Sequence, residues 1–234
     1  MTGTVHRLRH ITLSSLSPAL GGLIVAVGFV VCWSSGFVGS RLAVAIDTPV
    51  LALYAWRFAL ATLLAGGWWW RCRQRHQPRL NPRALAHEAL IGSLTVGGYL
   101  LTMLLAVKAG VSAEVAALIG ALQPLAAITL ASGWLGERTR PLQWLGMTMA
   151  TLGAALSVLD DLQGVGGAPL WAYGLPLLAV ACVTLGSALT TRQPATLPLE
   201  ARLTAQLMAA TGVFFLAALG MGGSLAPPTP SPDT

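Results

Sequence analysis

Residues 111–159, VSAEVAALIGALQPLAAITLASGWLGERTRPLQWLGMTMATLGAALSVL, contain two apolar runs of membrane-spanning length on either side of a short charged turn. The runs that carry no charge are Val115–Gly136 and Pro141–Leu159. A helix rises about 1.5 Å per residue, so about 20 residues cross a hydrocarbon core of about 30 Å. This stretch alone predicts two transmembrane helices.

Similar runs fill the rest of the 234-residue chain, of which 55% is hydrophobic and 9% is charged. Soluble domains carry about 25% charged residues. The run after Asp47 is interrupted only by Arg57. We therefore predict an all-α, polytopic integral membrane bundle of about seven helices, at approximately 19–40, 49–70, 87–107, 113–134, 141–159, 170–191 and 201–222.

Residue content argues against several classes of function. The net charge of +6 would suit a nucleic-acid binder, but the chain offers no basic surface outside the membrane, so no nucleic acid is expected as a partner. The three cysteines form no CxxC pair and the four histidines have no ligand spacing, so no metal or cofactor is expected. An enzyme would need facing catalytic groups within the spans, and no span interior contains histidine or aspartate.

The basic residues predict the orientation, because positively charged loops stay in the cytoplasm. An N-terminus inside the cell places eleven of the fourteen basic residues on the cytoplasmic side, namely Arg7, Arg9, Arg71, Arg73, Arg75, Arg79, Arg83, Arg138, Arg140, Arg192 and Arg202. We therefore expect a multi-pass protein of the inner membrane with a cytoplasmic N-terminus. The apolar first run is long and has no evident A-x-A site, which argues against a cleaved signal peptide.

The connectors carry helix-start signals. Asp47-Thr48-Pro49 combines a capping side chain with a first-turn proline, and Ser112 is positioned to cap the fourth span. Within that span, Pro124 lacks the N–H that would bond the Gly120 carbonyl, which predicts a cavity feature there.

Several of these segments resemble the EamA family of the drug/metabolite transporter superfamily. In Val111–Leu159, a small-residue helix with an internal proline runs into Gly136-Glu137-Arg138, and the next helix opens with Gln143-Trp144-Leu145-Gly146. Earlier, CWSSGFVGSRLA (Cys32–Ala43) and YAWRFALATLL (Tyr54–Leu64) look like the family's tryptophan-bearing first helix and arginine-bearing second helix. The resemblance covers residues 20–160.

The resemblance implies two five-helix repeats of opposite orientation. On this basis we expect a cytoplasmic segment at 1–18, a first repeat at 19–160, the first two helices of a second, apparently incomplete repeat at 161–222, and a disordered tail at 223–234. Three further helices of the family architecture would be missing after Thr234. A truncated or degenerate protein without transport activity of its own, or a partner subunit, therefore stands as the alternative to a transporter.

Candidate residues for a substrate pathway are the polar and aromatic side chains within the spans: Trp33, Ser34, Ser35, Arg57, Tyr99, Thr102 and Gln123. Arg57 is a charge well inside a span, which costs about 2.5–3.5 kcal/mol on insertion scales, so we expect it to face the bundle interior. It would there bond Asp47, Glu114 or a carbonyl, or meet an anionic substrate group. Two roles are open for Glu114, namely capping the first turn of its helix and ion coupling.

The resemblance implies a transporter that moves small metabolites, amino acids or drugs out of the cytoplasm by alternating access. Because no G-x-x-x-x-G-K-[ST] motif occurs, we expect an ion gradient, not ATP, to drive it. The expected partners are a small-molecule substrate and the lipid bilayer, and assembly into a homo-oligomer stays open.

Overall fold

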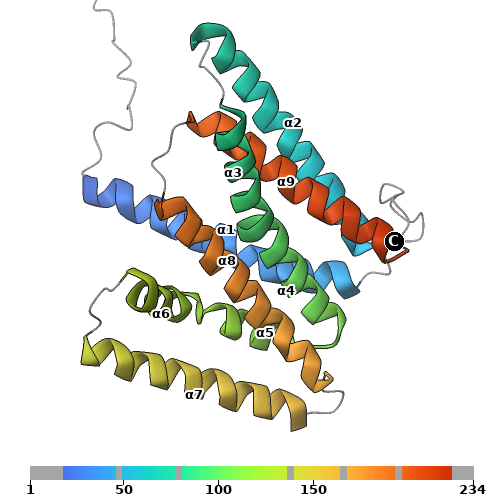
Figure 1. Ribbon diagram of the computed structural model, residues 1–234. Coiled ribbons are helices and arrows are strands. Elements are labelled where there is room, and N and C mark those ends of the chain that lie inside the picture. Colours follow the sequence, from blue (N-terminus) through green and yellow to red (C-terminus); the bar gives the residue numbers. More distant parts are fainter. Residues whose placement is uncertain are drawn as a thin grey trace, which may run out of the picture. The chain divides into compact units, whose positions relative to one another are not determined.

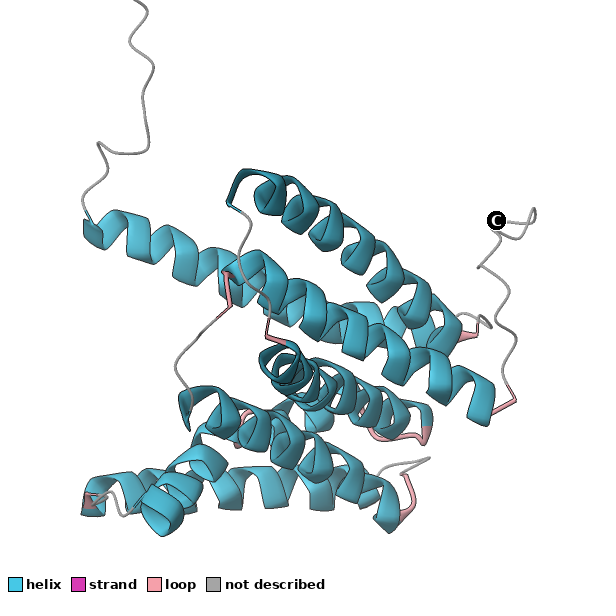
Figure 2. Ribbon diagram, turned by 45° about the horizontal axis from the view of Figure 1, so that its top comes forward, coloured by secondary structure: helices cyan, strands magenta, loops and turns pink. Residues whose placement is uncertain are grey.

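A computed structural model describes residues 18–45, 49–76, 81–135, 140–163, 168–192 and 197–222. This part of the chain consists of helices and connecting loops, with no strand (Figure 2). The chain divides into two compact units, Met1–Gly39 and Ser40–Thr234. The helix α1 (Pro18–Ala45) lies mainly in the first unit and exposes large apolar side chains such as Phe29 and Val30.

The second unit contains the other spans (Figure 1). Its elements are α2 (Val50–His76), α3 (Pro82–Gly92), the π-helix η2 (Ser93–Gly98), α4 (Tyr99–Lys108), α5 (Ala113–Gly120), α6 (Gln123–Leu135), α7 (Pro141–Gln163), the 3-10 turn η3 (Leu170–Tyr173), α8 (Gly174–Arg192) and α9 (Leu199–Gly220). Six described segments are long and apolar enough to cross a membrane, and Leu20–Cys32 in α1 is a shorter apolar helix. The predicted polytopic bundle of about seven helices is confirmed.

Several helix ends differ from the predicted ones by up to six residues, and two differences bear on the candidate site. The third span begins five residues earlier than predicted, at Pro82, and contains η2 between α3 and α4. The fourth span is not continuous, because α5 ends at Gly120 and α6 begins at Gln123 after the turn Ala121–Leu122. Both features lie in the interior of a membrane-length segment.

Local capping explains several helix starts. Ser112 caps α5 as predicted, since its Oγ accepts a hydrogen bond from the backbone N of Val115 at 3.3 Å. Asn81 Oδ1 accepts from the N of Arg83 at 3.0 Å and caps α3, which has Pro82 in its first turn. Of the predicted cap at the second span, Asp47 and Thr48 lie outside the described residues, while Pro49 directly precedes α2.

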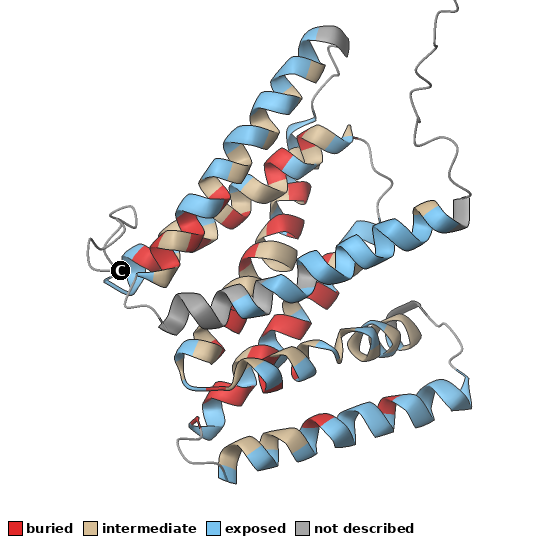
Figure 3. Ribbon diagram, turned by 180° about the vertical axis from the view of Figure 1, so that it is seen from behind, coloured by how far each residue is buried: buried red, intermediate tan, exposed pale blue. Residues whose placement is uncertain are grey.

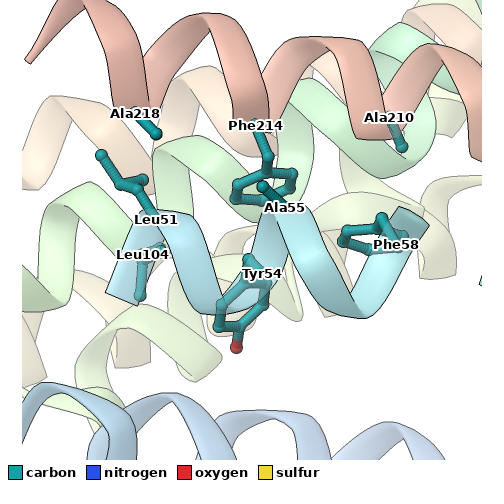
Figure 4. Packing of buried hydrophobic residues seen from close by; sticks show 8 residues of the cluster. All are labelled: Leu51, Tyr54, Ala55, Phe58, Leu104, Ala210, Phe214 and Ala218. Carbon is teal, nitrogen blue, oxygen red and sulfur yellow. The ribbon is translucent and has the colours of Figure 1, made fainter. Parts of the chain in front are cut away.

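An aromatic core joins α2 to α9 (Figure 4). The Phe214 ring stacks on Tyr54 and on Phe58, with centroids 5.3 Å apart in each pair. Aromatic pairs of this kind stabilise by about 0.5–1.5 kcal/mol beyond their buried area. Leu51 packs near Ala218 and Phe58 near Ala210, so the two helices run antiparallel.

Glycines bring α3, η2 and α4 into close contact with α8 and α9. A Cβ on Gly92 would lie 2.3 Å from the Cα of Gln206 in α9, and a Cβ on Gly186 in α8 would lie 2.4 Å from Cγ2 of Thr95. The third span therefore packs directly against both helices, at distances that a larger side chain would prevent. By contrast, α7 is exposed along most of its length, and its buried residues are Met147 and Ala154 (Figure 3).

Candidate functional site

The interruption between α5 and α6 follows from Pro124. Proline has no backbone N–H, so the carbonyl of Gly120, four residues earlier, loses its usual helical donor. In the structure, α5 ends at Gly120 and α6 begins at Gln123, so the fourth span is divided at this point. Non-helical backbone at membrane depth is tolerated where it is buried in protein or lines a cavity.

Tyr99 lies at this break. Its side chain is 4% exposed, and its hydroxyl is 3.5 Å from the position that a Cβ would take on Gly120. Gln123, at the start of α6, is half-buried. The structure thus brings Tyr99 to the same interruption as Gln123, two of the candidates that the sequence singled out.

Thr102 is also buried in α4, one turn beyond Tyr99. Its hydroxyl donates to the carbonyl of Gly98 at 2.7 Å and lies 3.1 Å from the carbonyl of Tyr99. This bonding occupies the hydroxyl proton within its own helix, as is common for threonine in transmembrane helices.

A hollow of about 240 Å³ borders the break on the side of α7. Its lining is apolar apart from Gln143, and Oε1 of Gln143 accepts a hydrogen bond from the N of Arg140 at 2.7 Å. The hollow therefore offers an apolar wall beside Pro124, with its one polar side chain engaged in starting α7.

Arg57 is exposed within the second unit, and its expected position facing the bundle interior stays a prediction. The side chain is exposed, and its guanidinium carbon lies 5.7 Å from the ring centroid of Tyr54 in the same helix. The face of α2 that packs on α9 carries Tyr54, Ala55 and Phe58, and Arg57 lies off that face. Its positive charge is stabilised by a cation–π contact within α2.

The candidates in the first span belong to α1. Ser34 and Ser35 are exposed, and Ser35 Oγ donates to the carbonyl of Cys32 at 2.8 Å. The side chain of Trp33 lies outside the described residues. The role of these three residues in a substrate pathway stays a prediction.

Glu114 lies in the first turn of α5, beside the Ser112 cap, and is exposed. A carboxylate in this position is favoured by the positive end of the helix dipole. Its role in ion coupling stays a prediction.

A buried polar cluster that sequence reasoning missed joins α3 to α9. The Nε of Arg202 donates to Oε1 of Glu88 at 2.7 Å, and Nε2 of Gln206 donates to Oε2 of Glu88 at 2.6 Å. The residue Glu88 is 7% exposed. The predicted third span began at residue 87, which left Glu88 at the membrane edge. The helix begins at Pro82, so Glu88 lies in its second turn.

A second contact that the sequence did not reveal lies between α7 and η3. The hydroxyl of Tyr173 donates to Oδ2 of Asp161 at 2.6 Å. It joins the C-terminal end of one span to the start of the next. Among the described residues, no three His, Cys, Asp or Glu side chains converge as metal ligands.

These features define a polytopic helical membrane protein in which the third span contains a π-helical segment and the fourth is divided by a turn, with the buried Tyr99 beside that turn. A family model for the EamA-like transporter family matches residues 20–159, and the chain belongs to this family of the drug/metabolite transporter superfamily. No curated protein and no solved structure matched the chain. The family is one of membrane transporters, which implies a small-molecule substrate and a lipid environment.

Proposed function

We propose that this protein exports small metabolites, amino acids or drugs from the cytoplasm by alternating access, driven by an ion gradient. The observation that carries the proposal is the turn that divides the fourth span before Pro124, which neighbours the third span with its π-helical segment η2. Transporters place their binding sites at discontinuous helices near the bilayer midplane, where unwound backbone offers polar groups to a solute. Membership of the EamA-like transporter family supports the same conclusion.

The residues proposed to line the pathway are those at and near the break. Tyr99 presents a buried aromatic ring and a hydroxyl, and Gln123 and the Gly120 carbonyl add polar groups. Trp33, Ser34 and Ser35 are proposed to complete the pathway from the first span. This combination of apolar wall and few polar groups is typical of small-molecule sites.

We propose that the protein lies in the inner membrane with its N-terminus in the cytoplasm. The clustering of arginines at alternate connectors supports it. The proposed repeats, 19–160 and 161–222, are supported by the antiparallel packing of α2 on α9, because inverted repeats place their second helices in opposite directions.

The proposal is tested with the purified chain in proteoliposomes loaded with a panel of unlabelled amino acids, by counterflow of the matching radiolabelled amino acid. We expect uptake of at least one amino acid above that of protein-free liposomes. Tyr99→Phe, which removes one hydroxyl at the break, should reduce this uptake. Tyr54→Phe, the same change in the α2–α9 core, is the matched control and should retain it.

Uptake no greater than that of protein-free liposomes across amino acids, and across a second panel of cationic dyes, would refute the export proposal. In that case the chain would act as a partner subunit or have no transport activity of its own. Equal loss of uptake in both tyrosine variants would refute the placement of the pathway at the break.

A further inference from the structure

Glu88 is the one charged side chain that is buried among the residues the structure describes. An ionised carboxylate at this depth is stable only when its oxygens are bonded and its charge is balanced. Both conditions are met, because Oε1 accepts from Arg202 and Oε2 accepts from Gln206. The pair connects residues 114 positions apart in the sequence.

The backbone around Glu88 is arranged for close approach of α3 and α9. One turn after Glu88, Gly92 lies against the main chain of Gln206, where a Cβ would be 2.3 Å from Cα and 2.5 Å from the carbonyl oxygen. The π-helix η2 begins at the next residue, Ser93. π segments are frequent at functional sites, and a local change of helix type offers a joint about which α3 can move relative to α4.

We propose that Glu88 is the binding site of the coupling proton, and that the proton and Arg202 compete for its carboxylate. This inference rests on the proposed transport function. When the pair is formed, α3 and α9 are held together near the ends at which both helices begin. When Glu88 binds a proton, the charge attraction to Arg202 is lost and the two ends can separate.

The proton balance follows from the side chains. The carboxylate takes up one proton and becomes a neutral acid with one O–H donor and one carbonyl acceptor. The Gln206 amide can turn over and accept from the O–H, while the carbonyl oxygen retains a weaker bond from Arg202. In the proposed cycle the proton arrives from the outside and leaves to the cytoplasm before the pair re-forms, so one proton enters for each solute exported.

The partly exposed side chain of Arg202 offers a route by which the proton can leave Glu88 for water. The Arg202 side chain is 23% exposed, whereas that of Glu88 is 9% exposed. In the proposed orientation, the N-terminal ends of α3 and α9 both lie at the cytoplasmic face. Arg202 therefore connects the buried carboxylate to water on that side.

Other charged and titratable groups occur on the elements around Glu88. On α9 they are Glu200 and Arg202, on α8 they are Cys182 and Arg192, and on α3 itself they are Arg83 and His87, while η2 has none. The described bonds of the Glu88 carboxylate are those from Arg202 and Gln206. In the proposal, the proton therefore competes with Arg202 for this carboxylate.

The test uses the full chain in proteoliposomes, with an amino acid that passes the counterflow assay and a lumen one pH unit more acidic than the medium. With the membrane potential held at zero by equal potassium on both sides and valinomycin, a one-proton exchange for a neutral solute supports accumulation of up to about tenfold, because one pH unit is a factor of ten in proton activity. We expect Glu88→Gln to abolish this accumulation and to retain counterflow at equal pH. Asp160→Asn, the same acid-to-amide change at an exposed acid of α7, is the matched control and should keep both activities.

The outcomes separate the two proposals. No counterflow by the wild-type chain refutes the transport function itself. Wild-type counterflow with gradient-driven accumulation that survives in Glu88→Gln overturns the assignment of the proton to Glu88 and leaves transport standing. If Glu88→Gln loses both activities, Glu88→Asp decides: recovery of accumulation supports the proton site, and loss of it assigns Glu88 a packing role and overturns the proposal.

Discussion

Gly92→Ala is expected to force α3 away from α9 and to destabilise the protein. The added Cβ would lie 2.3 Å from Cα, 2.5 Å from O and 2.7 Å from C of Gln206, all of them backbone atoms that cannot rotate away. Ordinary contacts begin at 3.4 Å, so the helices must separate locally by roughly 1 Å. The 2.6 Å hydrogen bond from Gln206 to Glu88 lies one turn away and would lengthen beyond bonding distance.

The net cost follows from three contributions. Overpacking costs about 1–3 kcal/mol, and a lost hydrogen bond between transmembrane helices about 0.6 kcal/mol. Replacing a helical glycine with alanine stabilises the helix by about 0.5–1 kcal/mol, which offsets part of this cost. The free energy of unfolding should therefore fall by about 2 kcal/mol, which lowers the Tm of a chain of this size by about 4–8 °C.

The assay is thermal unfolding of the detergent-solubilised protein, followed by size-exclusion chromatography of the fraction that stays monodisperse. Gly212→Ala is the matched control, because Gly212 also lies in a helix but has no neighbouring atom within 4 Å of the Cβ position. Its Tm should be unchanged or raised by up to about 4 °C. A Tm of Gly92→Ala equal to that of Gly212→Ala would refute the close packing of α3 on α9.

Three further changes test the core, the break and the ion pair. Phe214→Ala removes the one ring on which both Tyr54 and Phe58 stack and should lower the unfolding free energy by about 2 kcal/mol or more. The loss should be smaller for Phe215→Ala, because Phe215 is only half-buried, and equal losses in thermal scans of the two variants would contradict this. Pro124→Ala restores a helical N–H at the break and should raise the Tm while lowering counterflow, so a variant with unchanged Tm and transport would count against a functional break. Arg202→Ala leaves the buried Glu88 carboxylate without its partner and should lower the free energy of unfolding by about 3–5 kcal/mol. The double variant with Glu88→Ala should recover much of that loss, and strictly additive Tm losses would show that the two side chains do not interact.

The order of apolar and charged residues along the chain was sufficient to predict the fold class and the approximate positions of the membrane spans. Membrane-spanning length depends on how many apolar residues follow one another, which is a property of neighbours in the sequence. The cap at Ser112 and the freed Gly120 carbonyl opposite Pro124 were predictable for the same reason, because each involves backbone groups within four residues, although the span itself was expected to be continuous. The family resemblance was carried by short motifs and was confirmed over residues 20–159.

The side chains that meet across helices depended on the tertiary structure. Glu88 ends an apparently ordinary polar connector in the sequence, and only the packing of α9 on α3 buries it and supplies Arg202 and Gln206. For Arg57, the tertiary structure shows that α9 packs on a neighbouring face of α2, which the sequence did not indicate. The apolar period of a transmembrane helix does not mark its buried face, because lipid and protein interior are equally apolar, so the partners of each face are decided by the three-dimensional contacts between helices.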